Sequence, residues 1–346
     1  MGHSVWYLEN RDMCQFIPKY IVKIEKQPAL VESITEVDFD VSAGPSILNG
    51  QEKLTALEES MFAFSALPDI RSKEMHKESF VFNLENKMYH VSFIQEEDPS
   101  KVRGCTQKSI AIQCCRYLPV LPLIMSQKLC SSKMYTPEIA LEALKTLELP
   151  SNKEALRILH EHIPPHVHAL LEKHKNTIIE NLMRCKSFLV IGPTPTAVSL
   201  TVSYLSMFCG TRYGGKVLPY RSSFVNSPLP PSSILGVTNE HFYKQARFDN
   251  IINTTEGGYY YKEKKCTEDL ERLFGEMEEF FLDSPESFHV ERWLCRMSDF
   301  GASIRARRIF REFFNSANFV EWLSSHGYQE VLGGNKEKPL SQMDLN

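Results

Sequence analysis

One short segment near the middle of the chain limits the fold more than any other. In Ser187–Ile191 the last four residues are all apolar, and the run ends at Gly192-Pro193. From Thr196 to Phe208 the apolar residues then recur at helical spacing. A buried strand that turns directly into a helix is the unit of a parallel α/β sheet. The sequence therefore predicts an α/β core here, with Ser233–Val237 as its next strand.

The first third of the chain shows the alternation of an antiparallel sheet instead. The predicted segments are a short strand over 20–24, a strand over 33–41 that ends at Gly44-Pro45, a helix over 51–64, strands over 79–84 and 87–94, a polar loop over 95–104 and a strand over 107–115. A strand, a helix and then a meander indicate an antiparallel sheet with one helix packed on it. The strand over 107–115 leads into the stretch 118–125, which is apolar and broken by proline.

Helices dominate the remainder of the chain. Pro137 opens one helix, Ser151 or Asn152 caps the next, and Pro164-Pro165 ends it before a third helix over 168–183. From Thr267 almost to the end, three apolar stripes at helical spacing predict buried helix faces. The tail after Gly333 is polar, and we expect it to be disordered.

Composition excludes several classes of protein. The chain has 346 residues, of which 42% are hydrophobic and 24% charged, as in globular proteins. Its net charge of −4 gives no general attraction to nucleic acid. No apolar run approaches the roughly 20 residues of a membrane span, and the N-terminus does not resemble a secretory signal. Nine scattered cysteines fit reduced thiols. We therefore expect a cytoplasmic protein.

The motifs that usually carry chemistry are missing. The segment 192–199 stands where a phosphate loop would, but it lacks the glycines and lysine of one, so we interpret it as a proline-shaped helix start. Five histidines, His160, His162, His166, His168 and His174, lie close together in sequence. Pro164-Pro165 separates the two His-x-His pairs, and residues i and i+2 of a helix do not share a face. We expect a solvated helical surface, no metal site and no cofactor.

A basic stretch near the C-terminus leaves two interpretations open. It contains five arginines beside apolar residues: Arg296, Arg305, Arg307, Arg308 and Arg311. These side chains could meet anionic lipid or an acidic partner. They could equally form the polar outer face that a core helix needs.

Three blocks carry a resemblance to a known family. SFLVIGPTPTAVSLTVSYLSMF, 187–208, resembles the central strand and helix of a DENN domain, and PPSSILGVTNEHF, 230–242, is similar to a strand and turn of the DENN-domain-containing protein six subfamily. KVRGCTQKSIAI, 101–112, resembles a strand of the longin module that precedes a DENN domain. The likeness covers roughly 33–325. The stretch between Tyr220 and Pro230 is shorter than in the family, and SSFVNS replaces an acidic residue there.

The resemblance implies an α/β fold, with an N-terminal longin-like antiparallel sheet and helix followed by a DENN-type α/β core with C-terminal helices. The implied divisions are an unassigned segment over 1–32, a longin-like module over 33–130, a helical linker over 131–180, a DENN module over 181–330 and a disordered tail over 331–346. The implied function is guanine nucleotide exchange on a Rab-type small GTPase in vesicle trafficking. The protein would be recruited transiently to endosomal or other vesicle membranes, with or without a longin or DENN partner. The GTPase-binding residues would be Arg103, Gln107, Lys108, Tyr220 and Asn239.

Arg103 leaves the activity open. In the folliculin-like branch of the superfamily, the arginine of this Arg-Gly motif is an arginine finger that accelerates GTP hydrolysis. Alternatively, Arg103 contacts the GTPase without catalysis, or it only pairs at the surface with Glu96, Glu97 or Asp98. A non-catalytic scaffold that binds a GTPase is the third hypothesis, since a fold does not fix an activity.

Overall fold

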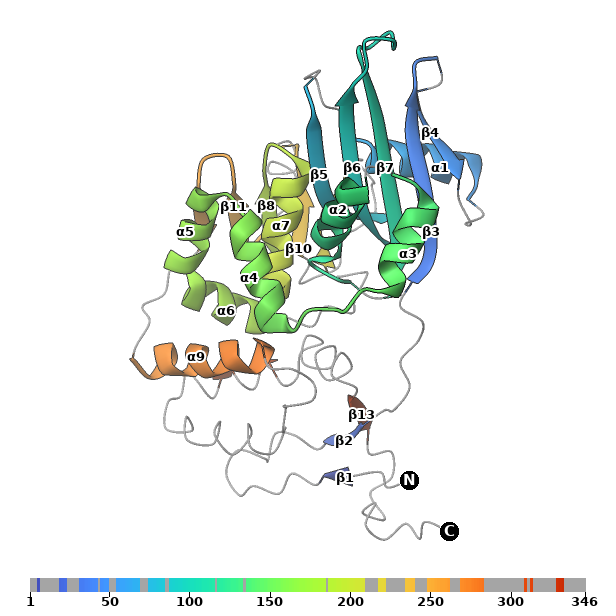
Figure 1. Cartoon of the computed structure of the whole chain (residues 1–346). Coiled ribbons are helices and arrows are strands. Elements are labelled where there is room, and N and C mark those ends of the chain that lie inside the picture. Colours follow the sequence, from blue (N-terminus) through green and yellow to red (C-terminus); the bar gives the residue numbers. More distant parts are fainter. Residues whose placement is uncertain are drawn as a thin grey trace, which may run out of the picture.

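A computed structural model shows a mixed α/β protein with two five-stranded sheets (Figure 1), so the α/β class expected from the sequence is confirmed. The structure describes residues 5–6, 19–23, 31–42, 44–49, 54–68, 74–84, 87–115, 117–132, 135–184, 186–208, 217–221, 234–239, 248–261, 268–282, 308–309, 312–313 and 328–332. Its helices are α1 (Ala56–Ala66), α2 (Leu121–Ser132), α3 (Pro137–Lys145), α4 (Asn152–His162), α5 (Pro165–Lys173), α6 (Lys175–Met183), α7 (Pro195–Ser206) and α9 (Glu268–Leu282). Its strands are β1 (Val5–Trp6), β2 (Lys19–Lys23), β3 (Val31–Asp40), β4 (Gly44–Asn49), β5 (His76–Leu84), β6 (Lys87–Glu97), β7 (Cys105–Cys114), β8 (Phe188–Ile191), β9 (Val217–Leu218), β10 (Ile234–Val237), β11 (Asn250–Asn253), β12 (Gly258–Tyr261) and β13 (Tyr328–Leu332).

The first sheet is antiparallel throughout, in the order β4-β3-β7-β6-β5. Because side chains alternate along a strand, the strands contribute residues to two cores, one on each face of the sheet. One core lies under α1, where the rings of Phe62, Phe82 and Tyr89 are in contact. The other packs α2 and α3 against the opposite face. The predicted strand–helix–meander order is confirmed.

Two elements of this region were not anticipated. The turn at Gly44, whose φ of 80° suits glycine, starts another strand, β4, where we expected the strand simply to end. The stretch 118–125, for which the sequence pattern predicted no helix, contains the start of α2. Pro122 is the second residue of this helix, where a backbone N–H has no helical partner and proline is therefore tolerated.

The second sheet has the order β12-β11-β8-β10-β9. Strands β9, β10, β8 and β11 run parallel, and β12 returns antiparallel to β11. The predicted strands β8 and β10 and the helix α7 between them are confirmed, whereas β9, β11 and β12 were missed. Thr194 caps α7 by accepting a hydrogen bond from the Ala197 N–H, and Pro195 follows in the first turn. This is the proline-shaped helix start that the sequence predicted.

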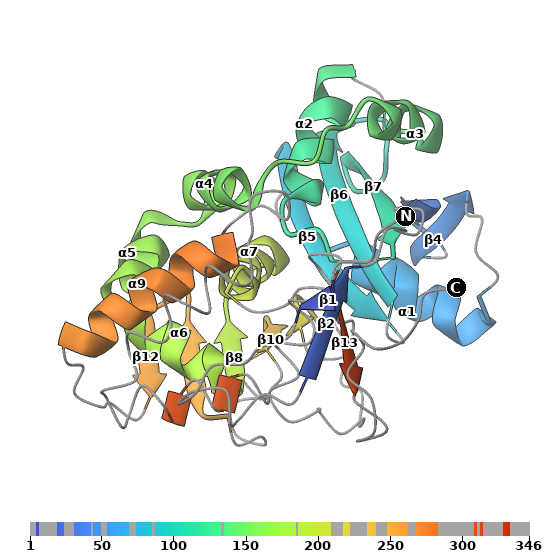
Figure 2. The same ribbon diagram turned by 90° about the horizontal axis from the view of Figure 1, so that it is seen from below.

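A helical layer packs on this second sheet. In it, α4, α5, α6, α7 and α9 share one core with the sheet, and α9 lies across α6 (Figure 2). The single helix predicted over 168–183 is wrong: α5 ends at Lys173 and α6 begins at Lys175. The chain bends at His174, whose ring contacts those of Tyr259 and Tyr261.

Helix α7 joins the two sheets. It lies against β5, an edge strand of the first sheet. The Ser79 N–H donates to Thr196 Oγ1, and the Val81 N–H donates to Ser199 Oγ, both at 2.9 Å. One turn further on, the hydroxyl of Ser203 lies 2.5 Å from that of Tyr117. These hydroxyl groups occur at helical spacing on one face of α7, and those of Thr196 and Ser199 satisfy backbone donors that the sheet leaves unpaired.

A small third sheet brings together the two ends of the described chain. Its order is β1-β2-β13, and both pairings are antiparallel. The strand predicted over 20–24 is confirmed as β2. The last predicted helix faces and the tail after Gly333 lie largely outside the described residues. Of the basic stretch, only Arg308 is described, and it is exposed and paired with Glu312 at 2.9 Å.

Candidate functional site

The β6–β7 hairpin and the carboxyl ends of the parallel strands are the two places in the fold where candidate residues lie. Thr196 is the second residue of α7 and follows directly from the carboxyl end of β8. Its partner Ser79 lies near the start of β5, close to where His76 pairs with Gln95 below the hairpin. The carboxyl end of β8 thus approaches β5 near the strand's start, whereas the carboxyl end of β9 approaches β5 near its other end, where the Tyr220 carbonyl accepts a hydrogen bond from the Asn83 N–H. Carboxyl ends of parallel strands are the usual place for binding residues in α/β folds.

Arg103 lies at the exposed tip of this hairpin. The tip is closed by the hydrogen bond from the Asp98 N–H to the Gly104 carbonyl, at 2.9 Å. The guanidinium carbon of Arg103 stands 3.8 Å from the centroid of the Phe39 ring, which is a cation–π contact. Among the described residues it forms no ion pair with Glu96, Glu97 or Asp98.

Gln107 and Lys108 point to opposite faces of β7. The side chain of Gln107 is buried and donates to Gln95 Oε1 at 2.7 Å, so it is used inside the sheet. The side chain of Lys108 is 39% exposed, and its Nζ lies 3.6 Å from Glu36 Oε1. Of these two candidates, Lys108 is therefore the one that a partner could reach.

Tyr220 and Asn239 follow the carboxyl ends of the neighbouring strands β9 and β10. The Tyr220 ring is buried edge-on against Phe80, with centroids 5.7 Å apart, and its carbonyl accepts from the Asn83 N–H at 3.4 Å. Burial raises the pKa of Tyr220, and a hydrogen bond to Thr238 opposes the rise. Tyr220 thus links the two sheets at the end of β5 that is remote from the hairpin, whereas Asn239, just beyond β10, is exposed.

Gly192 in the block 187–208 and Gly236 in the block 230–242 both allow α7 to pack closely on the second sheet. A Cβ on Gly236 would lie 2.1 Å from the Pro219 carbonyl oxygen and 2.4 Å from Val198 Cγ1. A Cβ on Gly192 would lie 2.2 Å from Thr254 Oγ1 and 2.8 Å from Val198 Cγ2. Only glycine allows α7 to approach the strand ends this closely.

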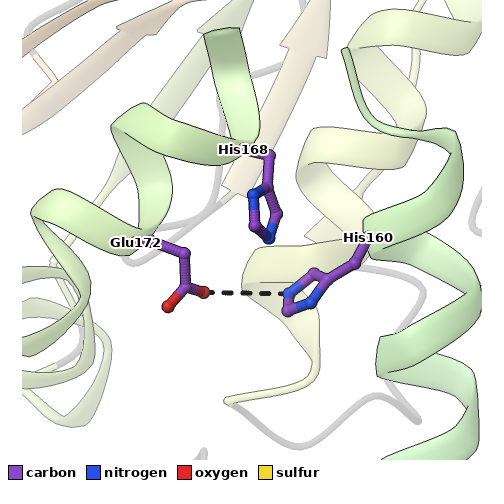
Figure 3. A group of neighbouring side chains, drawn as sticks. All are labelled: His160, His168 and Glu172. Atoms are coloured by element: carbon purple, nitrogen blue, oxygen red, sulfur yellow. Dashed lines mark ion pairs between the residues drawn. The ribbon is translucent and has the colours of Figure 1, made fainter. Parts of the chain in front are cut away.

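A second polar cluster lies on another face of α7 (Figure 3). It consists of His160 at the end of α4 and of His168 and Glu172 on α5, and we call it the histidine cluster. One ligand atom from each residue lies within 4.8 Å of the others. His160 Nε2 is 3.8 Å from Glu172 Oε1, and the two imidazole centroids are 4.3 Å apart.

The electrostatics of the histidine cluster favour a neutral imidazole at His160. Burial lowers the pKa of His160, and the neighbouring His168 lowers it further. The Nε2 atoms of both histidines are buried and have no hydrogen-bond partner among the described residues. The hydroxyl of Tyr204 donates to Glu172 Oε1 at 3.0 Å, and the ring of Tyr204 stacks on that of His160.

The expectation of solvated histidines is therefore only partly met. His162 and His166 are exposed, whereas His160, His168 and His174 are half-buried against other rings. The two members of each His-x-His pair do diverge, as the helical rule predicts. The turn at Pro164-Pro165, however, places one histidine of each pair against the other. The sequence signal for this is the i, i+4 spacing of His168 and Glu172, which puts both on one face of α5.

No protein-family model matches this chain, and no curated protein matches it. Among the helices that the structure describes, none is both long enough and apolar enough to cross a membrane.

Proposed function

We propose that the protein is a guanine nucleotide exchange factor for a Rab-type small GTPase, built from a longin-like and a DENN-like module. It acts in the cytoplasm and is recruited transiently to endosomal or other vesicle membranes, where its GTPase resides. It needs no cofactor, because exchange requires binding rather than side-chain chemistry.

The observation that carries this proposal is that each of the two sheets presents exposed candidate residues and that α7 joins these sheets. Arg103 and Lys108 lie on the first sheet, and Asn239 follows β10 of the second. Helix α7 holds the two sheets together through side-chain hydrogen bonds, so one partner could touch both. Gln107 and Tyr220 support this surface from inside instead of touching the partner.

The physics of exchange fits a chain without catalytic motifs. An exchange factor binds the nucleotide-free GTPase more tightly than the loaded one, and by linkage it weakens nucleotide binding by the same factor. A shift of about 10⁴-fold requires about 5.5 kcal/mol of differential binding. An ordinary protein interface can supply this amount.

The decisive experiment measures release of a fluorescent guanine nucleotide from a panel of Rab proteins, with and without the full chain. At least one Rab should release nucleotide faster, and it should bind more tightly when nucleotide-free. Arg103→Ala should lower the exchange rate and the affinity together, by roughly 10-fold to 100-fold, as expected for an interface arginine. Arg157→Ala is the matched control, because Arg157 is an equally charged, 64% exposed residue on α4 that pairs with Glu161 of the same helix.

The second candidate activity is stimulation of GTP hydrolysis. The observation that favours it is the exposed guanidinium of Arg103, which has no carboxylate partner among the described residues. An arginine finger acts on transition-state charge and is worth about 10³–10⁵ in rate. If Arg103→Ala abolishes stimulated hydrolysis but leaves binding intact, this activity replaces exchange. Equal affinity for loaded and empty Rab would contradict the exchange proposal and leave a non-catalytic scaffold.

A further inference from the structure

We propose that the histidine cluster, His160, His168 and Glu172, is a binding site for a divalent transition-metal ion, for which Zn²⁺ is the best match. Two imidazoles and one carboxylate are ligands that zinc accepts, and a set of three leaves one coordination position for water. This site is independent of the proposed exchange activity, since its residues lie on α4 and α5 and none of them is a candidate GTPase contact.

The geometry needs little adjustment to hold an ion. Donor atoms around a tetrahedral zinc lie about 3.3 Å apart. In the histidine cluster all three ligand atoms are within 4.8 Å of one another, and His160 Nε2 and Glu172 Oε1 are 3.8 Å apart. Side-chain rotations alone can make up this difference. The backbone already directs His168 and Glu172 from one face of α5 toward His160 on α4 (Figure 3).

The unsatisfied nitrogens give an independent reason for a ligand. His160 Nε2 and His168 Nε2 are both buried and have no hydrogen-bond partner among the described residues. Buried polar atoms are nearly always paired, so two orphaned nitrogens facing one point indicate a missing group. A metal ion bound by the two lone pairs would satisfy both at once.

The surroundings of Glu172 resemble the outer shell of a metal site. Metal-ligating carboxylates are usually held by hydrogen bonds, and the Tyr204 hydroxyl donates one to Glu172 Oε1 at 3.0 Å. Lys175 Nζ lies 3.6 Å from Glu172 Oε2 but is closer to Glu278, at 2.8 Å. The carboxylates of Glu172 and Glu278 share the one ammonium of Lys175, so the group has a net negative charge, which favours binding of a cation.

The site also has a route to solvent. The side chains of His160 and Glu172 are 30% and 37% exposed, so an ion can enter and water can complete its coordination. Once bound, the ion would connect α4 to α5 directly and both helices to α7 through Tyr204. The expected consequence is a stiffer helical layer over the parallel sheet.

The test uses the full chain freed of metal by a chelator. Zn²⁺ affinity is measured by calorimetry, and the site is examined by the visible absorption of bound Co²⁺. His160→Ala and His168→Ala should each weaken Zn²⁺ binding by at least about 100-fold, and Tyr204→Phe, which removes only the hydrogen bond to Glu172, by about 10-fold. His162→Ala is the matched control. It belongs to the same His-x-His pair but is exposed, and its Nδ1 contacts its own helix at the Ile158 carbonyl, so binding should not change.

Cysteine thiolates are the competing ligands, and four free cysteines are described. A thiolate site would show sulfur-to-cobalt charge-transfer absorption in the near ultraviolet, which nitrogen and oxygen ligands do not give. Circular dichroism of each metal-free variant establishes that it is folded. The proposal is overturned if folded His160→Ala and His168→Ala bind Zn²⁺ as the wild type does, if the thiolate band appears, or if the wild type binds no Zn²⁺ at micromolar concentrations.

Discussion

The two five-stranded sheets are stabilised in different ways. In the first, β5, β6 and β7 have 9, 11 and 10 residues and pair along nearly their whole length. In the second, β8, β10 and β11 have four residues each, and the fit of α7 against two glycines holds the strand ends together. The first sheet thus rests on many repeated hydrogen bonds, and the second on a few close approaches. We therefore expect the loss of a single contact to cost less unfolding free energy in the first sheet than a change at one close approach costs in the second.

The largest effect is expected at Gly236. Gly236→Ala adds a Cβ that meets the Pro219 carbonyl oxygen at 2.1 Å, and backbone atoms cannot rotate away. The free energy of unfolding, measured by urea denaturation, should fall by about 3 kcal/mol or more. Gly275→Ala is the control, because that Cβ in α9 meets nothing within 4 Å and should raise stability by about 0.5–1 kcal/mol. If the Gly236→Ala protein is as stable as the wild type, the close approach at Gly236 does not stabilise the second sheet, and the comparison of the two sheets fails.

Acid should weaken the first sheet through His90 on β6. Its Nε2 accepts a hydrogen bond from the Leu118 N–H at 3.0 Å, so the proton lies on Nδ1, which faces the Ile112 carbonyl. Burial lowers the pKa of His90 from its usual 6.5 to about 4, so the unfolded chain binds more protons between these values. Stability should therefore fall as the pH drops from about 6.5 to 4, by about 3 kcal/mol in total.

Urea denaturation at a series of pH values measures this loss. His90→Gln cannot titrate and should flatten the pH dependence, whatever it does to stability at neutral pH. His162→Ala, which removes an exposed histidine, should keep the wild-type slope. An unchanged slope in His90→Gln would show that another group senses the acid.

A smaller effect is expected where the two sheets meet. Ser199→Ala removes the acceptor of the buried Val81 N–H and should cost about 1–2 kcal/mol of unfolding free energy. Thr201→Val is the control on the same helix, because the Thr201 hydroxyl donates within α7, to the Ala197 carbonyl one turn earlier. If both variants lose the same stability, the hydrogen bond between α7 and β5 contributes nothing of its own.

Local sequence patterns predicted the elements that carry their own signals. The strand β8 and helix α7 were visible because an apolar run stops at Gly192-Pro193, and β5 and β6 because their residues favour strands. Strands β11 and β12 were missed although the turn between them contains Gly257 with a φ of 66°. Asn250 and Asn253 make β11 look like a loop, and only pairing with β8 makes it a strand. Strand β9 is too short to give any pattern.

The features of the candidate sites also divide into those that the local sequence predicts and those that depend on contacts between distant segments. Arg103 was expected to be exposed between an acidic loop and a strand, which are local features, and the structure places it at the exposed tip between β6 and β7. Its contact with Phe39 depends on the distant strand β3 and could not be foreseen. The burial of Gln107 and Tyr220 likewise depends on which face each residue meets across the sheets. The histidine cluster required knowing how α5 turns back against α4 after Pro164-Pro165.

The hydroxyl groups of α7 also affect how the chain avoids unwanted association. The open edge of a sheet is a template on which a strand from another molecule can add, leading to aggregation. Strand β5 is such an edge, and Thr196 and Ser199 occupy two of its free backbone donors. During synthesis β5 emerges long before α7, so its edge stays uncovered until more than a hundred further residues have been made. A chaperone would have its greatest value in that interval.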